Sequence, residues 1–363
     1  MRVAMTLEQC WHRVPGGTGV AAIEMARAIS ARDDVEIVGV AARHGTPPPP
    51  EWTPPVEVRH LPLPRVPLYE AWHRLRRPHV ERATGRIDLI HATSIAIPPR
   101  SAPLVVTIHD LLFLRQPDHF TRRGLGFFRR GLQLAVADAD LVLCSSQATV
   151  SNCLEAGFDE ARLRHVPLGV EVDRAEGAQV VTTRARYELA RPYVLWIGTI
   201  EPRKNLRGLL QAWRTLDRDD LDLVLVGPRG WREDLDALLS RAGGGVKTLG
   251  FVPRADLASL YAGAEVFCFP SLLEGFGLPV LEAMAQGTPV VTSRGTSTEE
   301  LAGDAALLVD PGDTSDIAAA IASLLDDPAL HAKLSDAGPE RAAQYSWATT
   351  AELIVSAYKE LVR

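Results

Sequence analysis

The chain has 363 residues, 46% of them hydrophobic and 23% charged, with a net charge of −6, which fits a folded globular protein of two domains. No apolar run reaches the roughly 18 residues of a membrane-spanning helix, and the first residues do not read as a signal peptide. Four scattered cysteines with no CxxC pair exclude a disulfide scaffold and a cysteine-based zinc site. We therefore expect a reduced, cytoplasmic protein.

Short apolar runs alternate with helical stretches along the whole chain. This alternation predicts an α/β fold with parallel sheets covered on both faces. In chain order the expected strands are Val3–Leu7, Val35–Ala41, Leu89–His91, Leu104–Ile108, Leu141–Cys144, Val194–Ile197, Leu223–Val226, Val266–Phe269, Pro289–Thr292 and Ala306–Val309. The expected helices include Gly19–Ser30, Leu206–Thr215, Asp234–Arg241, Arg254–Ala262, Pro279–Gln286 and the amphipathic Trp347–Leu361. The proline-rich segment 46–67 is expected to be a surface excursion.

Two series of strands predict two doubly wound domains. The first covers residues 1–175, a polar linker covers 176–192, the second domain covers 193–345, and a C-terminal helix lies within 346–363. In such sheets, ligands bind at the carboxyl ends of the strands. We therefore expect a ligand cleft between the two domains.

The densest chemical signal is the run from Phe269 to Val291. A strand ends near Phe269, a turn carries Gly275 and Gly277, and a helix begins near Pro279. Glycines let the backbone approach a ligand closely, and the free amides of a helix start hold anions or sugar oxygens. Two glutamates eight residues apart are weak evidence alone, since one could simply complement the helix dipole.

Further motifs accompany the E-x7-E element in EGFGLPVLEAMAQGTPVV: the run IGTIEPRKNL (197–206), TIHDL (107–111), PLGV (167–170) and ELAGDAA (300–306). Together these motifs resemble glycosyltransferase family 4. The resemblance implies the GT-B fold, two Rossmann-like domains facing a cleft, with the last helix crossing back to the first domain. It also implies sugar transfer from a nucleotide donor with retention of anomeric configuration and without a metal.

The resemblance assigns most site residues to the second domain. Glu274 would face the hydroxyls of the transferred sugar, beside the amides of Gly275, Phe276, Gly277 and Leu278. Glu282 would bind the ribose, and the base would lie around Gly250, Phe251 and Val252. Arg203 and Lys204 would stabilise the leaving diphosphate, which needs positive charge. Thr199 stands where many relatives carry an arginine, so these two cations are expected to act without a third.

In the first domain the resemblance points to a glycine-rich segment and one histidine. Gly16 and Gly17 would bring backbone amides to the donor phosphate or the acceptor, and His109 would meet the donor sugar. Taken alone, Gly17, Gly19 and Ala22 also fit the loose dinucleotide fingerprint, which leaves a nicotinamide-dependent oxidoreductase as a distant alternative.

The expected activity is that of a retaining hexosyltransferase most like bacterial mannosyltransferases of polysaccharide assembly. GDP-mannose is the first choice of donor, GDP- or UDP-linked sugars are the wider class, and no separate cofactor is expected. The acceptor would be a hydroxyl of a glycan, a glycolipid or a small molecule. A sugar phosphorylase, a nucleotide-sugar epimerase and a non-catalytic sugar-nucleotide binder remain alternatives. Nucleic-acid binding is not expected, because the chain is acidic and carries no recognisable module.

A basic region marks the first domain. Residues 59–130 carry 13 basic and 5 acidic side chains, and Phe120–Arg130 mixes arginines with aromatic residues. Such a stretch fits either peripheral contact with an anionic membrane, at the inner face of the plasma membrane, or an ordinary helix whose Phe127 and Phe128 lie in the core.

Overall fold

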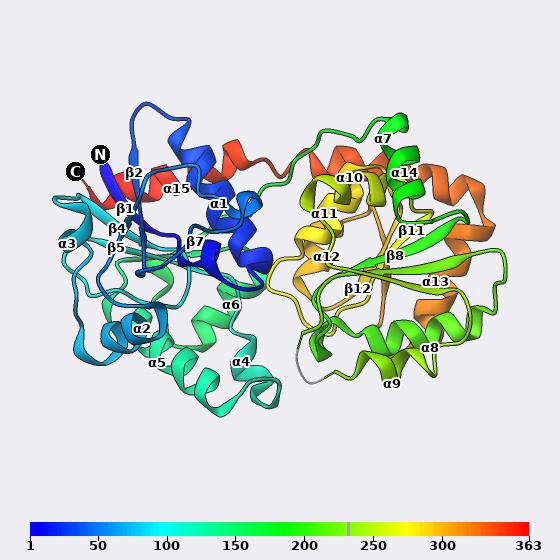
Figure 1. The fold of residues 1–363 in the computed structure, drawn as a ribbon, viewed down its shortest axis with the longest axis horizontal. Coiled ribbons are helices and arrows are strands. Elements are labelled where there is room, and N and C mark those ends of the chain that lie inside the picture. The colour runs from blue at the N-terminus through cyan, green and yellow to red at the C-terminus, as the bar shows by residue number, and fades with distance from the viewer. Residues whose placement is uncertain (231–232, 363) are drawn as a thin grey trace. The chain divides into compact units, whose positions relative to one another are not determined.

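The computed structural model describes residues 1–230 and 233–362, which divide into two compact units (Figure 1). Unit 1 contains Met1–Gly169 and the C-terminal segment that begins at Trp347, and unit 2 contains Val170–Ser346. Each unit has one parallel β-sheet with packed helices. Among the described residues, no helix is both long and apolar enough to cross a membrane.

Unit 1 has a seven-stranded parallel sheet in the order β3-β2-β1-β4-β5-β6-β7. The inner strands are almost wholly buried because they consist of continuous apolar runs. The chain reverses its direction of winding between β1 and β4. The strands are β1 (Arg2–Thr6), β2 (Glu36–Ala41), β3 (Val58–His60), β4 (Leu89–Ala92), β5 (Leu104–Ile108), β6 (Leu141–Cys144) and β7 (Leu163–His165).

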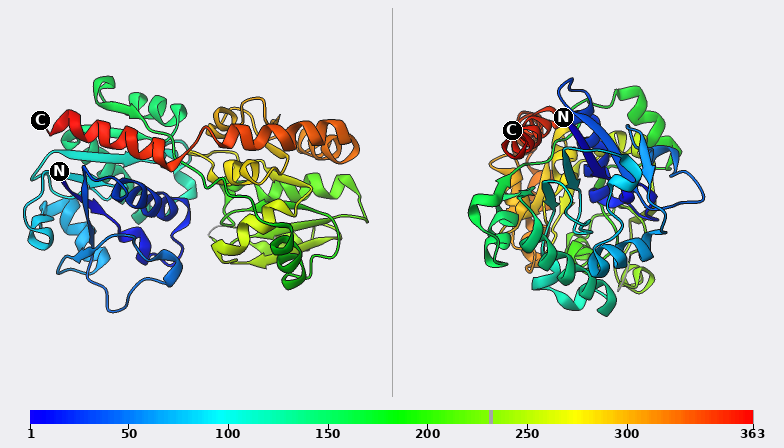
Figure 2. Two further views of the ribbon diagram at one scale, coloured as in Figure 1. Left: turned by 90° about the horizontal axis from the view of Figure 1, so that it is seen from above. Right: turned by 90° about the vertical axis from the view of Figure 1, so that its left-hand side faces the viewer.

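The helices of unit 1 include two that are far apart in sequence but packed together, the first and the last (Figure 2). The α-helices are α1 (Gly16–Ser30), α2 (Arg65–Leu75), α3 (Glu81–Thr84), α4 (Leu112–Arg115), α5 (Arg122–Asp138), α6 (Gln147–Glu155) and α15 (Trp347–Leu361). Short 3₁₀ helices are η1 (Glu8–Trp11), η2 (Pro50–Trp52), η3 (Pro117–His119) and η4 (Glu160–Arg162).

A buried hydrogen-bond chain holds α15 to the sheet of unit 1. His91 on β4 is fully buried, and its Nδ1 lies 2.6 Å from Tyr358 Oη on α15. Its Nε2 lies 2.7 Å from Thr107 Oγ1 on β5. Burial lowers the pKa of His91 to about 3, so the imidazole is neutral in the folded chain.

Unit 2 has a six-stranded parallel sheet in the order β10-β9-β8-β11-β12-β13. The strands are β8 (Tyr193–Ile197), β9 (Asp222–Val226), β10 (Val246–Gly250), β11 (Val266–Phe269), β12 (Val290–Ser293) and β13 (Leu307–Val309). Helices α8 and α13 pack together, as do α11 with α14 and α7 with α10 (Figure 1). The winding direction reverses between β8 and β11.

The helices of unit 2 follow the strands in regular alternation. They are α7 (Gly177–Arg186), η5 (Pro202–Lys204), α8 (Leu206–Leu216), α9 (Leu235–Leu239), α10 (Arg254–Ala262), α11 (Leu278–Ala285), α12 (Ser297–Ala302), α13 (Thr314–Asp326) and α14 (Pro328–Ala342). The two α/β domains expected from the sequence are present, and so are the ten expected strands, whose ends shift by at most one residue.

The structure corrects two local expectations. The segment 176–192, predicted to be a linker, contains α7, because Glu176 and Gln179 form a capping box and Arg186 binds Asp256 of α10 at 2.7 Å. Helix α1 begins at Gly16 instead of Gly19, so the glycine-rich segment forms its first turn.

Candidate active site

The loops that follow β8 and β11 meet at the point where the sheet of unit 2 reverses its winding. Leu272 N–H donates to Arg203 O at 2.8 Å, and Asn205 Nδ2 donates to Pro270 O at 2.9 Å. Ligands of doubly wound sheets bind at this kind of position. The two hydrogen bonds therefore fix the position of Arg203 relative to the loop that carries Glu274.

Asn205 is the residue that shapes the loop after β8. Its backbone is left-handed, with φ of 54°, and its Oδ1 accepts from Gly208 N–H at 3.2 Å to cap α8. Asparagine tolerates this backbone conformation better than most residues and is a favoured helix cap. The preceding turn, η5, presents Arg203 and Lys204 at the start of α8.

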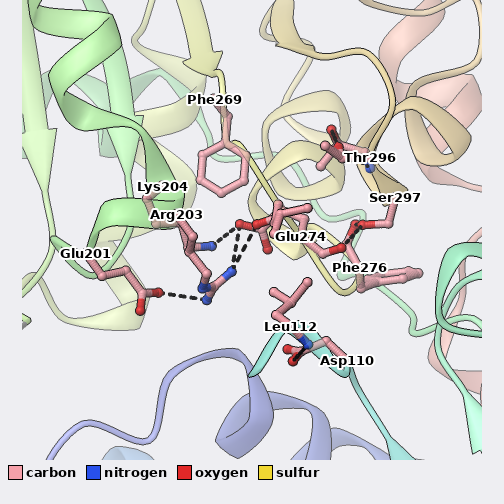
Figure 3. A network of polar contacts seen from close by, with 12 residues as sticks. Asp110, Leu112, Glu201, Arg203, Lys204, Phe269, Glu274, Phe276, Thr296 and Ser297 are labelled. Carbon is pink, nitrogen blue, oxygen red and sulfur yellow. Dashed lines mark hydrogen bonds and ion pairs between the residues drawn. The ribbon is translucent and has the colours of Figure 1, made fainter. Parts of the chain in front are cut away.

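Two cations and two carboxylates form an ionic cluster in these loops (Figure 3). Arg203 Nη1 lies 3.1 Å from Glu274 Oε1, and Arg203 Nη2 lies 2.7 Å from Glu201 Oε1. Lys204 Nζ donates to the same Glu274 oxygen. The side chains of Glu201, Lys204 and Glu274 are nearly buried, and buried charges need ionic partners. Each charge in the cluster has such a partner in direct contact.

The pKa shifts in the cluster follow from burial and from its charges. Burial acts to raise the pKa of Glu274, but the Lys204 and Arg203 charges outweigh it and leave that pKa below its usual value. Burial, supported by the Arg203 charge, lowers the pKa of Lys204. Burial raises the pKa of Glu201. Glu274 is the carboxylate that this cluster holds most firmly in its ionised form.

Phe269 completes the surroundings of Lys204. The ammonium lies 4.7 Å from the centre of the Phe269 ring, a cation–π distance, and the ring is fully buried at the end of β11. Lys204 is thus held between a carboxylate and an aromatic face. The Lys204 side chain is only 10% exposed, so its Nζ is largely shielded from bulk water.

The turn between Glu274 and α11 depends on Gly277. This residue has φ of 115°, and a Cβ there would lie 2.6 Å from Thr298 Cγ2. Ser297 Oγ lies 3.0 Å from Glu274 O and 2.8 Å from Phe276 O, which fixes the turn from the side of α12. Helix α11 begins at Leu278 with its amides directed at this turn.

Glu282 lies on α11, apart from the ionic cluster. Its Oε2 accepts a hydrogen bond from Tyr261 Oη at 2.8 Å. Burial raises the pKa of Glu282. Tyr261 therefore orients this carboxylate from α10.

The predicted base-binding segment lies at the end of β10. Gly250 O accepts from Gly227 N–H at 2.7 Å, Phe251 is 56% exposed, and Val252 is buried. Gly227 directly follows β9, and a Cβ there would lie 1.9 Å from Gly198 O, so only glycine fits between β8 and β10 at this level. The exposed Phe251 ring is the apolar surface that this segment offers.

The remaining predicted residues belong to unit 1. His109 follows β5, its Nε2 lies 3.1 Å from Thr93 O, and burial lowers its pKa. Gly16 and Gly17 are exposed at the start of α1, and no side chain or backbone approaches the place where their Cβ atoms would be. This glycine segment lies inside a helix turn, whereas a dinucleotide site needs a tight turn directly after a strand, which counts against the nicotinamide alternative.

Sequence reasoning missed three residues of the site: Glu201, Asn205 and Tyr261. Glu201 and Asn205 lie on either side of Arg203 and Lys204 in the sequence. Their position beside the predicted cations could have identified them as site residues. Tyr261 could not be found in this way, because its contact to Glu282 joins two helices 21 residues apart in sequence.

Two family models together match most of the chain. The model of glycosyl transferases group 1 matches residues 184–341, and that of glycosyltransferase family 4 matches residues 15–174. O-antigen chain mannosyltransferase B of Escherichia coli is 35% identical over 313 residues, covering 82% of each chain. The chain belongs to this glycosyltransferase family. The MMP alpha-(1->4)-mannosyltransferase of Mycolicibacterium hassiacum is 31% identical and covers 77% of this chain and 72% of its own.

Solved structures share the fold of this glycosyltransferase at low identity. HepE from Anabaena, crystallised with UDP and glucose, has a TM-score of 0.80 at 22% identity, covering 99% of this chain and 100% of its own. WaaG, a glycosyltransferase involved in lipopolysaccharide biosynthesis, has a TM-score of 0.75 at 17% identity, covering 98% of both chains. These neighbours confirm the GT-B fold predicted from the sequence.

Proposed function

We propose that this glycosyltransferase moves mannose from GDP-mannose to a hydroxyl of a glycan, glycolipid or small molecule, with retention of configuration. The ionic cluster of Arg203, Lys204 and Glu274, at the winding reversal of unit 2, is the observation that carries the proposal. The choice of mannose rests on the relatives, which are named as mannosyltransferases.

In this proposal the two cations bind the donor diphosphate. Departure of the nucleotide leaves a diphosphate with extra negative charge, which Arg203 and Lys204 stabilise, together with the amides at the start of α11. The diphosphate would replace Glu274 as the partner of the cations. Glu274 would then accept hydrogen bonds from the sugar hydroxyls, while the ion pair between Glu201 and Arg203 would remain.

The proposed chemistry needs no protein nucleophile. A retaining glycosidase mechanism requires two carboxyl groups about 5 Å apart on either side of the bond. Glu274 is instead tied to two cations, and its lowered pKa makes it a poor proton carrier. We propose that the acceptor hydroxyl attacks from the face that the diphosphate leaves, and that a diphosphate oxygen takes its proton.

Glu282 and the segment 250–252 complete the proposed donor site. The Glu282 carboxylate, oriented by Tyr261, would accept hydrogen bonds from the ribose hydroxyls, and Phe251 and its neighbours would contact the base. His109, Gly16 and Gly17 of unit 1 would contact the donor sugar and phosphate or the acceptor. The nucleotide sugar acts as substrate, and no metal is required. Of the residues that the structure describes, no three His, Cys, Asp or Glu side chains form a metal-binding group.

A donor panel tests this proposal directly. Thermal shift and slow hydrolysis are measured with GDP-mannose, GDP-fucose, UDP-glucose and UDP-N-acetylglucosamine, without added metal. We expect GDP-mannose to stabilise the protein most, and proton NMR of the product to show an α-linkage. Glu274→Ala should abolish transfer but still bind GDP, whereas Glu299→Gln, on α12, should transfer normally. Wild-type turnover by Glu274→Ala would refute the role of Glu274, and turnover that depends on inorganic phosphate would favour a phosphorylase.

We also propose electrostatic contact of unit 1 with an anionic membrane surface, in the cytoplasm. Phe127 stacks on His73 at 4.4 Å and Phe128 on Phe113 at 5.4 Å, so these rings pack within unit 1. Arg123 on α5 and Arg74 on α2 are exposed and line one groove with Leu75, which is 72% exposed. Glu70 lines the same groove, and its carboxylate lies 3.0 Å from Arg74 Nε and 3.8 Å from Arg123 Nη2. Sedimentation with phosphatidylglycerol vesicles, lost at high salt, would support the contact; no sedimentation at low salt would remove it.

A further inference from the structure

Helix α12 supports the turn of residues 274–277, which we name the donor turn. Ser297 is the first residue of α12, and its Oγ lies 3.0 Å from Glu274 O and 2.8 Å from Phe276 O (Figure 3). The Ser297 hydroxyl thus contacts the turn at two of its four residues. The position of the donor turn therefore depends on the position of α12.

Arg341, on α14, holds the other end of α12. Its Nε donates to Leu301 O at 2.8 Å, and its Nη2 donates to Glu300 O at 2.7 Å. The last carbonyls of a helix have no partner within the helix, and an arginine side chain can satisfy them. Gly303 directly follows α12, and a Cβ there would lie 3.3 Å from Arg341 Nε. The guanidinium therefore packs closely against the end of α12.

Tyr345 joins Arg341 to the donor turn. The guanidinium carbon of Arg341 lies 5.3 Å from the centre of the Tyr345 ring, a cation–π distance, and Arg341 Nη2 donates to Tyr345 Oη at 3.0 Å. The same ring meets the Phe276 ring at 71°, with centres 6.2 Å apart, in an edge-to-face arrangement. Phe276 itself is buried. Ser297 therefore fixes Phe276 through its carbonyl, and Tyr345 fixes it through its ring.

The backbone of Tyr345 is fixed without the help of its ring. Its N–H donates to Ala342 O at 2.9 Å, and its carbonyl accepts from Val170 N–H at 2.9 Å. The side chain is half-buried and takes no part in either bond. Loss of the ring should therefore leave the path of the chain unchanged and remove only the contacts to Arg341 and Phe276.

The cations of the ionic cluster are held by different contacts. Leu272 N–H donates to Arg203 O, Asn205 Nδ2 donates to Pro270 O, and neither bond involves α12 or α14. In the proposed function these cations bind the diphosphate, whereas the donor turn faces the transferred sugar. The donor site thus has two separate supports, one for each of these parts of the donor.

We propose that Arg341 and Tyr345 are positioning residues for the transferred sugar. This inference rests on the proposed transferase function, because it names the residues that hold the donor turn of the same site. Arg341 keeps α12 in place and Tyr345 keeps Phe276 in place, so that the amides of the turn meet the sugar in the geometry that transfer needs. Both residues act through the turn, without contact to the donor. Their effect lies in kcat, because groups held in place before the reaction stabilise its transition state.

The test separates the sugar from the rest of the donor. Calorimetry gives the Kd of GDP, and hydrolysis of GDP-mannose without acceptor gives kcat and KM, all with the full-length protein. Tyr345→Ala and Arg341→Ala remove the two supports, whereas Tyr345→Phe keeps the ring. Lys333→Ala is the control, because Lys333 is an exposed cation on the same helix. If Tyr345→Ala does not fold, Tyr345→Leu replaces it, since leucine fills part of the space but offers no aromatic edge.

We expect Tyr345→Ala and Arg341→Ala each to lower kcat about tenfold or more, with the Kd of GDP changed less than about threefold. Tyr345→Phe and Lys333→Ala should keep kcat within about twofold of the wild-type value. Unchanged kcat in either alanine variant, or a loss of GDP affinity as large as the loss of kcat, would overturn the inference. A loss of kcat in Tyr345→Phe as large as in Tyr345→Ala would do so as well. A wild type that neither binds GDP nor hydrolyses GDP-mannose would overturn the transferase proposal, and this inference with it.

Discussion

The buried imidazole of His91 should make the stability of unit 1 depend on pH. An unfolded chain protonates this residue near its usual pKa of 6.5, whereas the folded chain does so only near 3. Between pH 6.5 and pH 3 the unfolded state binds a proton that the folded state does not bind. The free energy of unfolding of unit 1 therefore keeps its full value above about pH 6.5 and decreases as the pH falls below it. The full difference of 3.5 pKa units corresponds to about 5 kcal/mol, of which about 2 kcal/mol is lost by about pH 5.

The perturbation is His91→Gln, which removes the titrating group but keeps hydrogen-bonding capacity toward Thr107 and Tyr358. Urea unfolding is followed by hydrogen exchange and mass spectrometry at about pH 7.5 and about pH 5. Peptides from β4 and β5 report unit 1, and peptides from β8 and β9 report unit 2. His79→Gln serves as control, since His79 is exposed in the same unit.

The variant should be less stable than wild type at the higher pH, because a buried hydrogen-bond geometry is altered. Its acid-induced loss of stability in unit 1 should be smaller than that of wild type by about 2 kcal/mol. Equal acid-induced losses in the wild type and in His91→Gln would refute the reasoning. So would a comparable effect of His79→Gln, or an effect confined to the unit 2 peptides.

Other predictions follow from single contacts. Tyr358→Phe leaves His91 Nδ1 without its partner and should lower the urea-unfolding free energy of unit 1 by about 1–3 kcal/mol; an unchanged value would show that the hydrogen bond is dispensable. Gly277→Ala places a Cβ 2.6 Å from Thr298 Cγ2 at φ of 115°, so it should lower the melting temperature and weaken GDP binding in calorimetry, whereas Gly244→Ala, where no atom lies within 4 Å, should not weaken GDP binding. Tyr261→Phe should weaken GDP binding several-fold by releasing Glu282, and equal affinity would remove its orienting role. Transfer should persist in excess EDTA, and loss of activity restored by Mg²⁺ would contradict the metal-independent proposal.

The sequence predicts the centre of each sheet well, but it misses three of the four edge strands. Inner strands such as β5 and β11 are continuous apolar runs because helices cover both faces. The edge strands β3, β7 and β10 are partly exposed, and β3 and β7 have only three residues each, so their sequences do not differ clearly from loops. β3 also lies within the proline-rich segment, which reads as irregular.

The candidate site likewise has residues that the sequence predicts and contacts that it does not. Arg203, Lys204 and Glu274 could be assigned because each belongs to a compact motif after a strand. That Glu274 binds both cations could not be predicted, because 70 residues separate it from Lys204 and the contact exists only after β8 and β11 pair.

The place of α15 in unit 1 has a consequence for biosynthesis. The ribosome synthesises all of unit 2 before it synthesises α15, the helix that completes unit 1. During translation unit 1 therefore lacks α15, and His91 lacks its partner Tyr358, until unit 2 has been synthesised. Unit 2 is about half of the polypeptide and can fold independently in that time. A premature stop codon within α15 would thus damage the N-terminal unit, and that unit stays accessible to chaperones and proteases until α15 has been made.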